Sequence, residues 1–240
     1  MIDVLSLNCW KNEGDLATRL PRIADGLAGL GPHIACLQEV YADTHVDVGR
    51  ALSAATGLPG FVHPMRTKDR GAGRSTAGLA VLTALPVRRV EALALPSNAE
   101  DGGRFAQGVD LDAPFGPLRV LNLHLTHLQR GEGLRAAQME AALAWARTGW
   151  SGPILVAGDL NAAADSRAIA ALFGAADLVA PPSLPADAGS LHHRPGWVID
   201  HVVLLQAPGF TIERRLVFQD EEAVSDHAGV HARVAAATNR

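Results

Sequence analysis

The sequence has few cysteines and no long apolar run. Its two cysteines, Cys9 and Cys36, lie in apolar, strand-like segments, and two cysteines form neither a disulfide framework nor a zinc-ligand pattern, so we expect buried free thiols. No uninterrupted apolar segment approaches the roughly 20 residues that a membrane span requires, so we expect no transmembrane segment. Residues 1–7 lack a basic leader before a cleavable apolar region, which favours a cytoplasmic location.

An excess of positive charge and an abundance of aromatic residues are also absent. The chain has 21 Lys and Arg against 25 Asp and Glu, a formal net charge of −4, whereas proteins that bind long duplexes usually present a strong positive field. Aromatic residues make up 5% of the chain, which leaves few stacking platforms for single-stranded nucleic acid. Nucleic acid remains a candidate partner only through a local basic groove.

The length and apolar content predict one packed domain over residues 1–240. The chain is 48% hydrophobic, and no linker-like stretch divides it. Alternating apolar residues predict strands, and apolar residues at helical spacing predict helices, so the pattern indicates mixed α and β. The expected strands are 2–7, 33–38, 79–82, 87–95, 105–111, 118–125, 154–157, 198–205, 211–218 and 229–235. The expected helices are 16–30, 44–55, 132–148 and 166–173, and the expected loops are 71–76, 97–104, 180–185 and 190–197.

One stretch, residues 156–162, places two short polar side chains at the end of an apolar run. Asp159 and Asn161 are two residues apart, and alternate residues of a strand share a face, so both side chains would point the same way. The alternative is a loop in which Asp and Asn hydrogen-bond their own backbone.

Polar side chains end several other predicted strands. A half-buried sheet has no packing reason to place carboxylates, amides and imidazoles at so many strand ends, and together these groups indicate a metal site. The residues are Asn8, Glu39, His124, the Asp159/Asn161 pair, Asp200 and the Asp226/His227 pair.

These residues lie in short motifs that resemble the endonuclease/exonuclease/phosphatase superfamily, the group of deoxyribonuclease I, neutral sphingomyelinases and inositol polyphosphate 5-phosphatases. The resemblance runs from residue 5 to about residue 234, and six motifs in order are far more specific than any one of them. It implies an α+β, deoxyribonuclease I-like fold: a four-layer sandwich of two packed mixed sheets flanked by helices. The motifs are Leu7-Asn8, Leu37-Gln-Glu39-Val40, Leu121-Asn-Leu-His124-Leu125, Gly158-Asp159-Leu-Asn161, Ile199-Asp200-His201 and Ser225-Asp226-His227.

The resemblance implies a divalent metal, Mg²⁺ or Mn²⁺, and residues that hold it. Glu39 is the expected principal ligand, because a hard carboxylate suits these ions. Asn8 would lie beside it and orient a metal-bound water, although an amide there could equally cap a turn. Asp226 would add a second carboxylate from the far end of the chain.

The resemblance also implies roles in water attack on a phosphoester. Asp159 would orient and deprotonate the water, and Asn161 would donate to a phosphate oxygen or hold the same water. His227 would stabilise the transition state or accept the proton, with Asp200 fixing its tautomer. His124 would contact the scissile phosphate and could serve as general acid.

Side chains of the loops near the site are expected to determine substrate specificity. Arg74, Arg104 and Arg194 could hold phosphate, while Trp10 and Trp197 offer flat apolar walls. The short loops and acidic balance favour a phosphodiesterase or phosphatase for a small or lipid-derived phosphoester. The alternatives are a nuclease, including one that repairs damaged DNA, and a catalytically silent interaction domain of the same fold.

Overall fold

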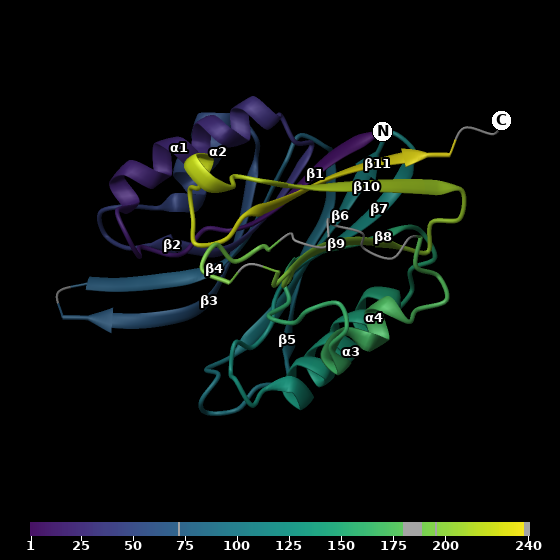
Figure 1. Cartoon of the computed structure of the whole chain (residues 1–240). Helices are drawn as coiled ribbons and strands as arrows, with labels where there is room; N and C mark the ends of the chain where they lie inside the picture. Colours follow the sequence, from purple (N-terminus) through teal and green to yellow (C-terminus); the bar gives the residue numbers. More distant parts are fainter. Residues whose placement is uncertain (72, 180–188, 195, 238–240) are drawn as a thin grey trace.

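Two β-sheets pack face to face at the centre of the protein, and helices cover their outer faces (Figure 1). The computed structural model describes residues 1–71, 73–179, 189–194 and 196–237. The first sheet has six strands, in the spatial order β10 (Phe210–Val217), β11 (Gly229–Ala236), β1 (Ile2–Asn8), β2 (Ile34–Ala42), β4 (Gly73–Thr83) and β3 (Gly60–Arg70).

The second sheet has five strands, and both sheets are mixed. In the first sheet β1 and β2 run parallel, and in the second β7 and β8 do. The other neighbouring strands of both sheets are antiparallel. The second sheet has the order β5 (Val87–Leu95), β6 (Arg104–Ala113), β7 (Gly116–His124), β8 (Ile154–Asp159) and β9 (Asp200–Leu205).

Helices form the two outer layers. The helix α2 starts after Asp47, later than the expected residue 44, because the Asp47 side chain accepts a hydrogen bond from the Arg50 amide and caps the first turn. No helix in the described part of the chain is both long and apolar enough to cross a membrane. The helices are α1 (Leu16–Leu30), α2 (Val48–Thr56), α3 (Glu132–Arg147) and α4 (Ala170–Phe173), with the short 3₁₀ turns η1 (Arg167–Ile169) and η2 (Asp220–Glu222).

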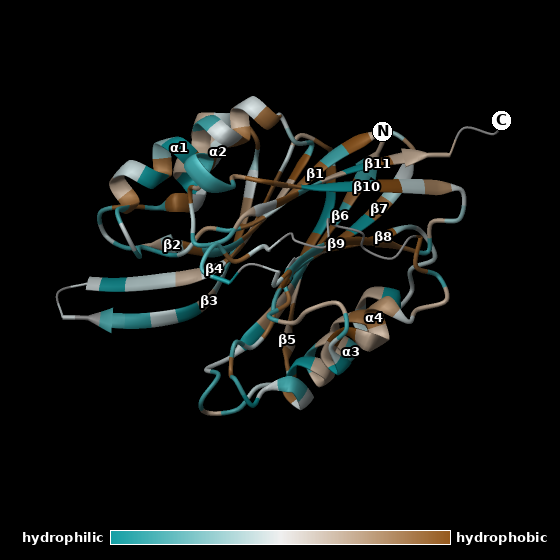
Figure 2. Cartoon of the chain, viewed as in Figure 1, coloured by the Kyte–Doolittle hydropathy of each residue, from teal (hydrophilic) through white to brown (hydrophobic). Residues whose placement is uncertain are grey.

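Three apolar layers hold the elements together. One lies between the sheets and includes Val4, Val109 and Leu155, all fully buried. The second joins the five-stranded sheet to α3, and the third joins the six-stranded sheet to α1 and α2. Figure 2 accordingly shows the apolar residues concentrated in the inner strands and on the inward faces of the helices. The four-layer α+β sandwich is thus confirmed.

A projecting hairpin is the main error of the sequence-based assignment. Residues 73–76 of the expected loop 71–76 belong to a strand, because β4 begins at Gly73 and Gly73 pairs with Arg70 of β3. The outer half of this hairpin leaves the body of the protein and is hydrophilic on both faces (Figures 1 and 2), so it lacks the apolar alternation that indicates a strand. Similarly, Arg104 begins β6 rather than ending a loop. The expected loop at 180–185 falls outside the described residues.

Both cysteines are buried free thiols, as expected. Burial raises the pKa of Cys9 and of Cys36 to about 12, and only the thiolate reacts rapidly with disulfide reagents. We therefore expect neither thiol to react with DTNB in the native protein at about pH 8, and both to react in guanidinium chloride. Rapid native-state release of the chromophore would show that one of these thiols is accessible, contrary to the packing.

Candidate active site

A cavity of about 240 Å³ opens where several strands end. Its walls come from both sheets, because β1 ends at Asn8, β7 at His124 and β8 at Asp159. Seven of the predicted catalytic and metal-binding residues line it: Asn8, Glu39, His124, Asp159, Asn161, Asp226 and His227. Asp200, the remaining one, lies directly behind His227.

Strand register brings three of these groups into one row. His124 pairs with Asp159 across β7 and β8, and Asp159 pairs with Asp200 across β8 and β9. Gly158 permits the close approach of β8 to β7, because a Cβ atom there would lie 2.0 Å from the Leu123 carbonyl oxygen. The row is nearly or fully buried, so its charges interact with little screening from water.

Asp159 is held by two hydrogen bonds. Asn8 Nδ2 donates to Asp159 Oδ2 over 3.0 Å, and the Asn161 amide donates to Oδ1 over 2.9 Å. Burial raises the pKa of Asp159 to about 7, and the neighbouring Asp200 adds to this effect. The carboxylate therefore has a proton affinity suited to proton transfer near neutral pH.

Asn161 reaches the cavity by a turn, not as part of a strand. The strand β8 ends at Asp159, and Asn161 adopts a left-handed conformation with φ 50°, which Asn tolerates better than most residues. Its side-chain amide donates to the Leu125 carbonyl over 3.0 Å. The expectation from strand alternation was wrong for Asn161, and the self-hydrogen-bonded turn was the correct alternative; the side chain still lines the cavity.

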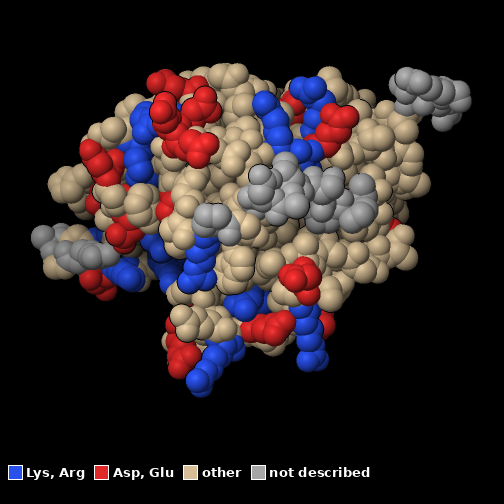
Figure 3. Space-filling view, in the orientation of Figure 1, with Lys and Arg blue, Asp and Glu red and all other residues tan. Residues whose placement is uncertain are grey.

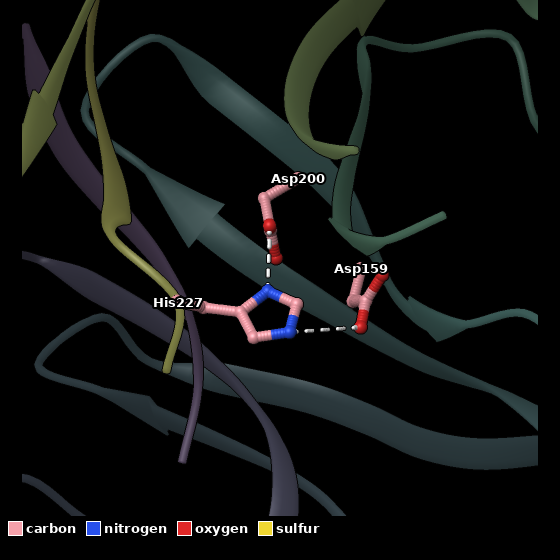
Figure 4. Close-up of side chains that lie close together, drawn as sticks. All are labelled: Asp159, Asp200 and His227. Carbon is pink, nitrogen blue, oxygen red and sulfur yellow. Dashed lines mark hydrogen bonds and ion pairs between the residues drawn. The ribbon is translucent and has the colours of Figure 1, made fainter. Parts of the chain in front are cut away.

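His227 lies between two carboxylates, as Figure 4 shows. Its Nδ1 is 2.8 Å from Asp200 Oδ2, and its Nε2 is 3.9 Å from Asp159 Oδ2. Burial alone would lower the pKa of His227, but the charges of Asp200 and Asp159 outweigh burial and raise it to about 10. The ring is consequently an imidazolium at neutral pH, and both of its nitrogens are donors.

His124 has the opposite protonation state. Burial, reinforced by the nearby Arg104 guanidinium, lowers the pKa of His124 well below its ordinary value. Its Nε2 lies 3.5 Å from Asp159 Oδ2. A neutral imidazole can donate one hydrogen bond to a phosphate oxygen, and the role of general acid stays a prediction.

Glu39 is delivered by a bulge inside a strand, not by a strand end. The strand β2 continues to Ala42, and its register against β4 shifts between Leu37 and Val40. Glu39 has φ 53°, and such a bulge redirects a side chain that regular alternation would place elsewhere. Its carboxylate is 2.8 Å from the Lys11 ammonium.

An amide from the opposite sheet supports this bulge. Asn122, on β7, donates from Nδ2 to the carbonyl oxygens of Leu37 and Ala80 over 3.0 Å each. Gln38 donates in turn to Asn122 Oδ1 over 2.8 Å. The two sheets are thus joined by buried polar contacts directly beside Glu39. The sequence could have indicated a role for Asn122, because this residue lies in the same motif as His124.

The oxygen donors around Glu39 suit a hard divalent cation. Glu39, Asp226 and Asn8 line the same cavity, and Mg²⁺ and Mn²⁺ prefer carboxylate, carbonyl and water oxygens. The Asn8 amide also accepts from the Trp10 backbone over 2.9 Å, so the turn-capping alternative is correct as well. The cation paired with the Glu39 carboxylate in this structure is the ammonium of Lys11.

A second group of possible ligands lies deeper. The ligand atoms of Asp159, Asp200 and His227 all lie within 4.8 Å of one another, so these residues could also hold a metal ion. We favour the Glu39 side of the cavity, because His227 Nδ1 already donates to Asp200 and both oxygens of Asp159 already accept hydrogen bonds.

Arg104 lines the cavity but is not a free phosphate clamp. It is 2% exposed, and its guanidinium contacts Asp101 Oδ1, the His124 carbonyl and His127 Nδ1 at 2.9, 3.3 and 2.9 Å. Since its donors are directed at protein atoms, it positions His124 and His127. His127 also lines the cavity, where its ring is held by the contact with Arg104.

The other predicted substrate contacts do not line this cavity. Arg74 is exposed on the projecting hairpin, 3.3 Å from Asp69. Arg194 lies over the Trp197 ring at 4.9 Å, so these two residues contact each other. The Trp10 ring is covered by the Arg19 guanidinium at 4.9 Å. Their role in substrate binding stays a prediction. The segment that carries Arg194 and Trp197 does lie beside the site, because Leu191 forms a β-bridge with His227 and the His192 backbone N–H donates to the Asp226 carbonyl.

Sequence reasoning missed Lys11 and Arg66 in the cavity wall. Lys11 follows the end of β1 in a polar stretch that resembles an ordinary turn, although Trp10 and Lys11 have φ values of 57° and 42°. Arg66 lies on β3, the strand that lacked an apolar pattern. His201, next to Asp200 in the chain, does not line the cavity and contacts the Ala162 carbonyl and the Phe173 ring.

The two packed mixed sheets, with carboxylates and imidazoles gathered where strands end, define a deoxyribonuclease I-like protein. The sequence profile of the Endonuclease/Exonuclease/phosphatase family matches residues 5–227. The chain belongs to this family.

Solved structures share the fold at low sequence identity. The endonuclease/exonuclease/phosphatase from Beutenbergia cavernae is 20% identical with a TM-score of 0.76, over 98% of this chain and 72% of that one. The human Nocturnin catalytic domain with bound sulfate is 19% identical with a TM-score of 0.77, over 98% and 93%. Sphingomyelinase C from Streptomyces griseocarneus is 18% identical with a TM-score of 0.69, over 96% and 98%. Comparison with curated protein sequences gives no match.

Proposed function

We propose that the protein is a cytoplasmic, divalent-metal-dependent phosphoesterase that hydrolyses a phosphodiester or phosphomonoester bond of a small or lipid-derived substrate. One observation carries this proposal: the hydrogen-bonded Asp159 faces the same cavity as Glu39, with the Asp200-paired His227 beside it. A carboxylate that can accept a proton, a fixed imidazolium and oxygen donors for a cation are the parts that phosphoester hydrolysis by water requires.

Asp159 is the proposed proton acceptor. Its Oδ2 is oriented by the Asn8 amide, and its raised pKa lets it take a proton from an attacking water near neutral pH. His227 stabilises the negative charge that develops on the phosphate oxygens, because an imidazolium fixed by Asp200 donates without reorganisation. Of the two roles left open for His227, the stabilising one fits its raised pKa. His124 and Asn161 supply further polar groups to the same phosphate.

The proposed metal is Mg²⁺ or Mn²⁺, which Glu39 and Asp226 would hold with Asn8 beside them. When bound, it would neutralise charge on the phosphate and lower the pKa of a bound water. The complete polar set also argues against a silent interaction domain, since such a domain needs none of these groups. A lipid-derived substrate is in keeping with the fold shared with sphingomyelinase C.

The central test is metal-dependent hydrolysis. Purified protein should release p-nitrophenol from bis(p-nitrophenyl) phosphate with added Mg²⁺ or Mn²⁺, and excess EDTA should stop the release until the metal is restored. A panel of sphingomyelin, phosphoinositides, small phosphodiesters, plasmid DNA and an abasic oligonucleotide, each with and without metal, separates the proposed enzyme from the nuclease alternative. Inactivity across the whole panel would overturn the proposal in favour of an interaction domain.

A further inference from the structure

A second, smaller recess adjoins the catalytic cavity at the root of the β3–β4 hairpin. It measures about 100 Å³, which is room for several water molecules. Lys11, Arg66 and Ala77 belong to the walls of both spaces, so the recess continues the cavity and is not a separate surface feature. We refer to it as the hairpin recess, with Lys11, Arg66, Lys68, Ser75 and Thr76 among its lining residues.

Strand register explains how the hairpin builds this recess. Arg66 pairs with Ala77 and Lys68 pairs with Ser75 across β3 and β4, while Tyr41 on β2 pairs with Ala77 from the other side. Since alternate residues share a face of a sheet, Arg66 and Lys68 lie on the same face. The small side chain of Ala77 leaves space between Tyr41 and Arg66.

The recess extends away from the catalytic cavity by a defined length. Gly78 belongs to the wall of the cavity and Ser75 to the wall of the recess. Three residues of a strand cover about 10 Å. One small molecule of this length can therefore place its phosphoester in the cavity and a second group in the recess.

The charge of the recess is predominantly positive. Lys11, Arg66 and Lys68 line it together with Glu13, the single carboxylate in the described wall. The Lys11 ammonium also contacts the Glu39 carboxylate of the adjoining cavity at 2.8 Å. The exposed side chain of Lys68 makes no hydrogen bond or ion pair with another described side chain or backbone group. Arg66 is anchored through its contacts with Asp101. Figure 3 shows Lys and Arg side chains gathered around the base of the hairpin, although the whole chain carries a net charge of −4.

We propose that the hairpin recess binds a second phosphate group of the substrate, so that the preferred substrate carries a phosphate monoester in addition to the phosphoester that is cleaved. A phosphate monoester has about −1.5 to −2 charge and several acceptor oxygens, which match the ammonium groups of Lys11 and Lys68, the Arg66 guanidinium and the hydroxyl of Ser75. This inference rests on the proposed function and narrows its substrate class. Such a phosphate could come from a nucleotide or from an inositol lipid.

The test uses substrate pairs that differ only by the additional phosphate. One pair is the dinucleotide TpT and its 5′-phosphorylated form, and the other is short-chain phosphatidylinositol and its 4-phosphate. We expect the phosphorylated member of at least one pair to have a kcat/KM about 10-fold higher, mainly through KM. Lys68→Ala should reduce this preference to about 2-fold or less. A gain in only one pair identifies the source of the phosphate.

Arg74→Ala is the matched control. It removes the same charge from the same hairpin, but Arg74 pairs with Asp69 and does not line the recess, so the preference should persist. Equal kcat/KM values within both pairs, or a preference that survives Lys68→Ala, would overturn the inference. Melting temperatures verify that both variants fold.

A binding measurement separates this inference from the proposed function. In excess EDTA, titration calorimetry should show thymidine 3′,5′-bisphosphate binding about 10-fold more tightly than thymidine 5′-monophosphate to the native protein, and about equally to Lys68→Ala. Failure of the proposed function would appear as no hydrolysis of any substrate with metal. Failure of the second-phosphate site would appear as equal binding of the two nucleotides, whether or not the protein hydrolyses.

Discussion

His227→Ala should lower kcat on bis(p-nitrophenyl) phosphate by about 1,000-fold, because it removes the donor that is fixed between Asp200 and Asp159. Loss of one such donor in other hydrolytic sites has effects of this order. Asp200→Asn should have a smaller effect of about 100-fold, since the ring remains but loses the carboxylate that keeps it charged and oriented. Steady-state kinetics with saturating metal measures both effects.

His201→Ala is the matched control for this prediction. It removes an imidazole that is equally buried and adjacent to Asp200, but His201 contacts the Ala162 carbonyl and the Phe173 ring away from the cavity. Its kcat should stay within about 3-fold of the native value, although its melting temperature should fall because a packed ring is lost. A His227→Ala variant with near-native turnover would show that the imidazolium takes no part in the reaction.

Asp159→Asn should reduce kcat by about 1,000-fold or more while leaving the protein at least as stable. The amide keeps the size of the side chain but cannot accept a proton from water. Burial and Asp200 raise the pKa of Asp159, so the native carboxylate is ionised at a free-energy cost that Asn avoids. Kinetics and thermal unfolding of the same sample measure the two effects.

The exposed Asp165, six residues further along the chain, provides the comparison. Asp165→Asn makes the same chemical change outside the cavity and should leave kcat unchanged within about 2-fold. If Asp159→Asn were inactive but also strongly destabilised, a structural role for the carboxylate would replace the proton-accepting one.

The sequence predicted which residues gather in the cavity more accurately than it predicted the backbone features that place them there. Asp159, Asp200 and His124 end or begin regular strands, so the apolar pattern located them, and the parallel register of β7 with β8 and the antiparallel register of β8 with β9 explain their convergence. Glu39 was identified by its motif, but the bulge that turns it into the cavity depends on contacts with β4 and with Asn122 of the other sheet. Contacts of such long range leave no periodic signal in the chain.

Arg104 and the β3–β4 hairpin illustrate the limits in a different way. Arginine in a polar loop indicates solvent exposure, whereas Arg104 is buried because Asp101, His124 and His127 together satisfy its guanidinium. The outer part of the hairpin contains few apolar residues because it contacts no core, so hydrophobic pattern assigned only the buried residues 79–82 as a strand. The burial of a charged side chain and the formation of a solvent-exposed strand both depend on residues that are distant in the sequence and close in space.

The hydrophilic character of β3 also affects how the protein behaves at high concentration. This strand is the outermost one of its sheet and therefore offers unpaired backbone groups along one side. Pro64, Lys68 and Asp69 lie on it, and proline and charged side chains on such a border discourage the strands of other molecules from adding to it. The ribbon that extends from the body thus protects the chain against self-association through its β-structure.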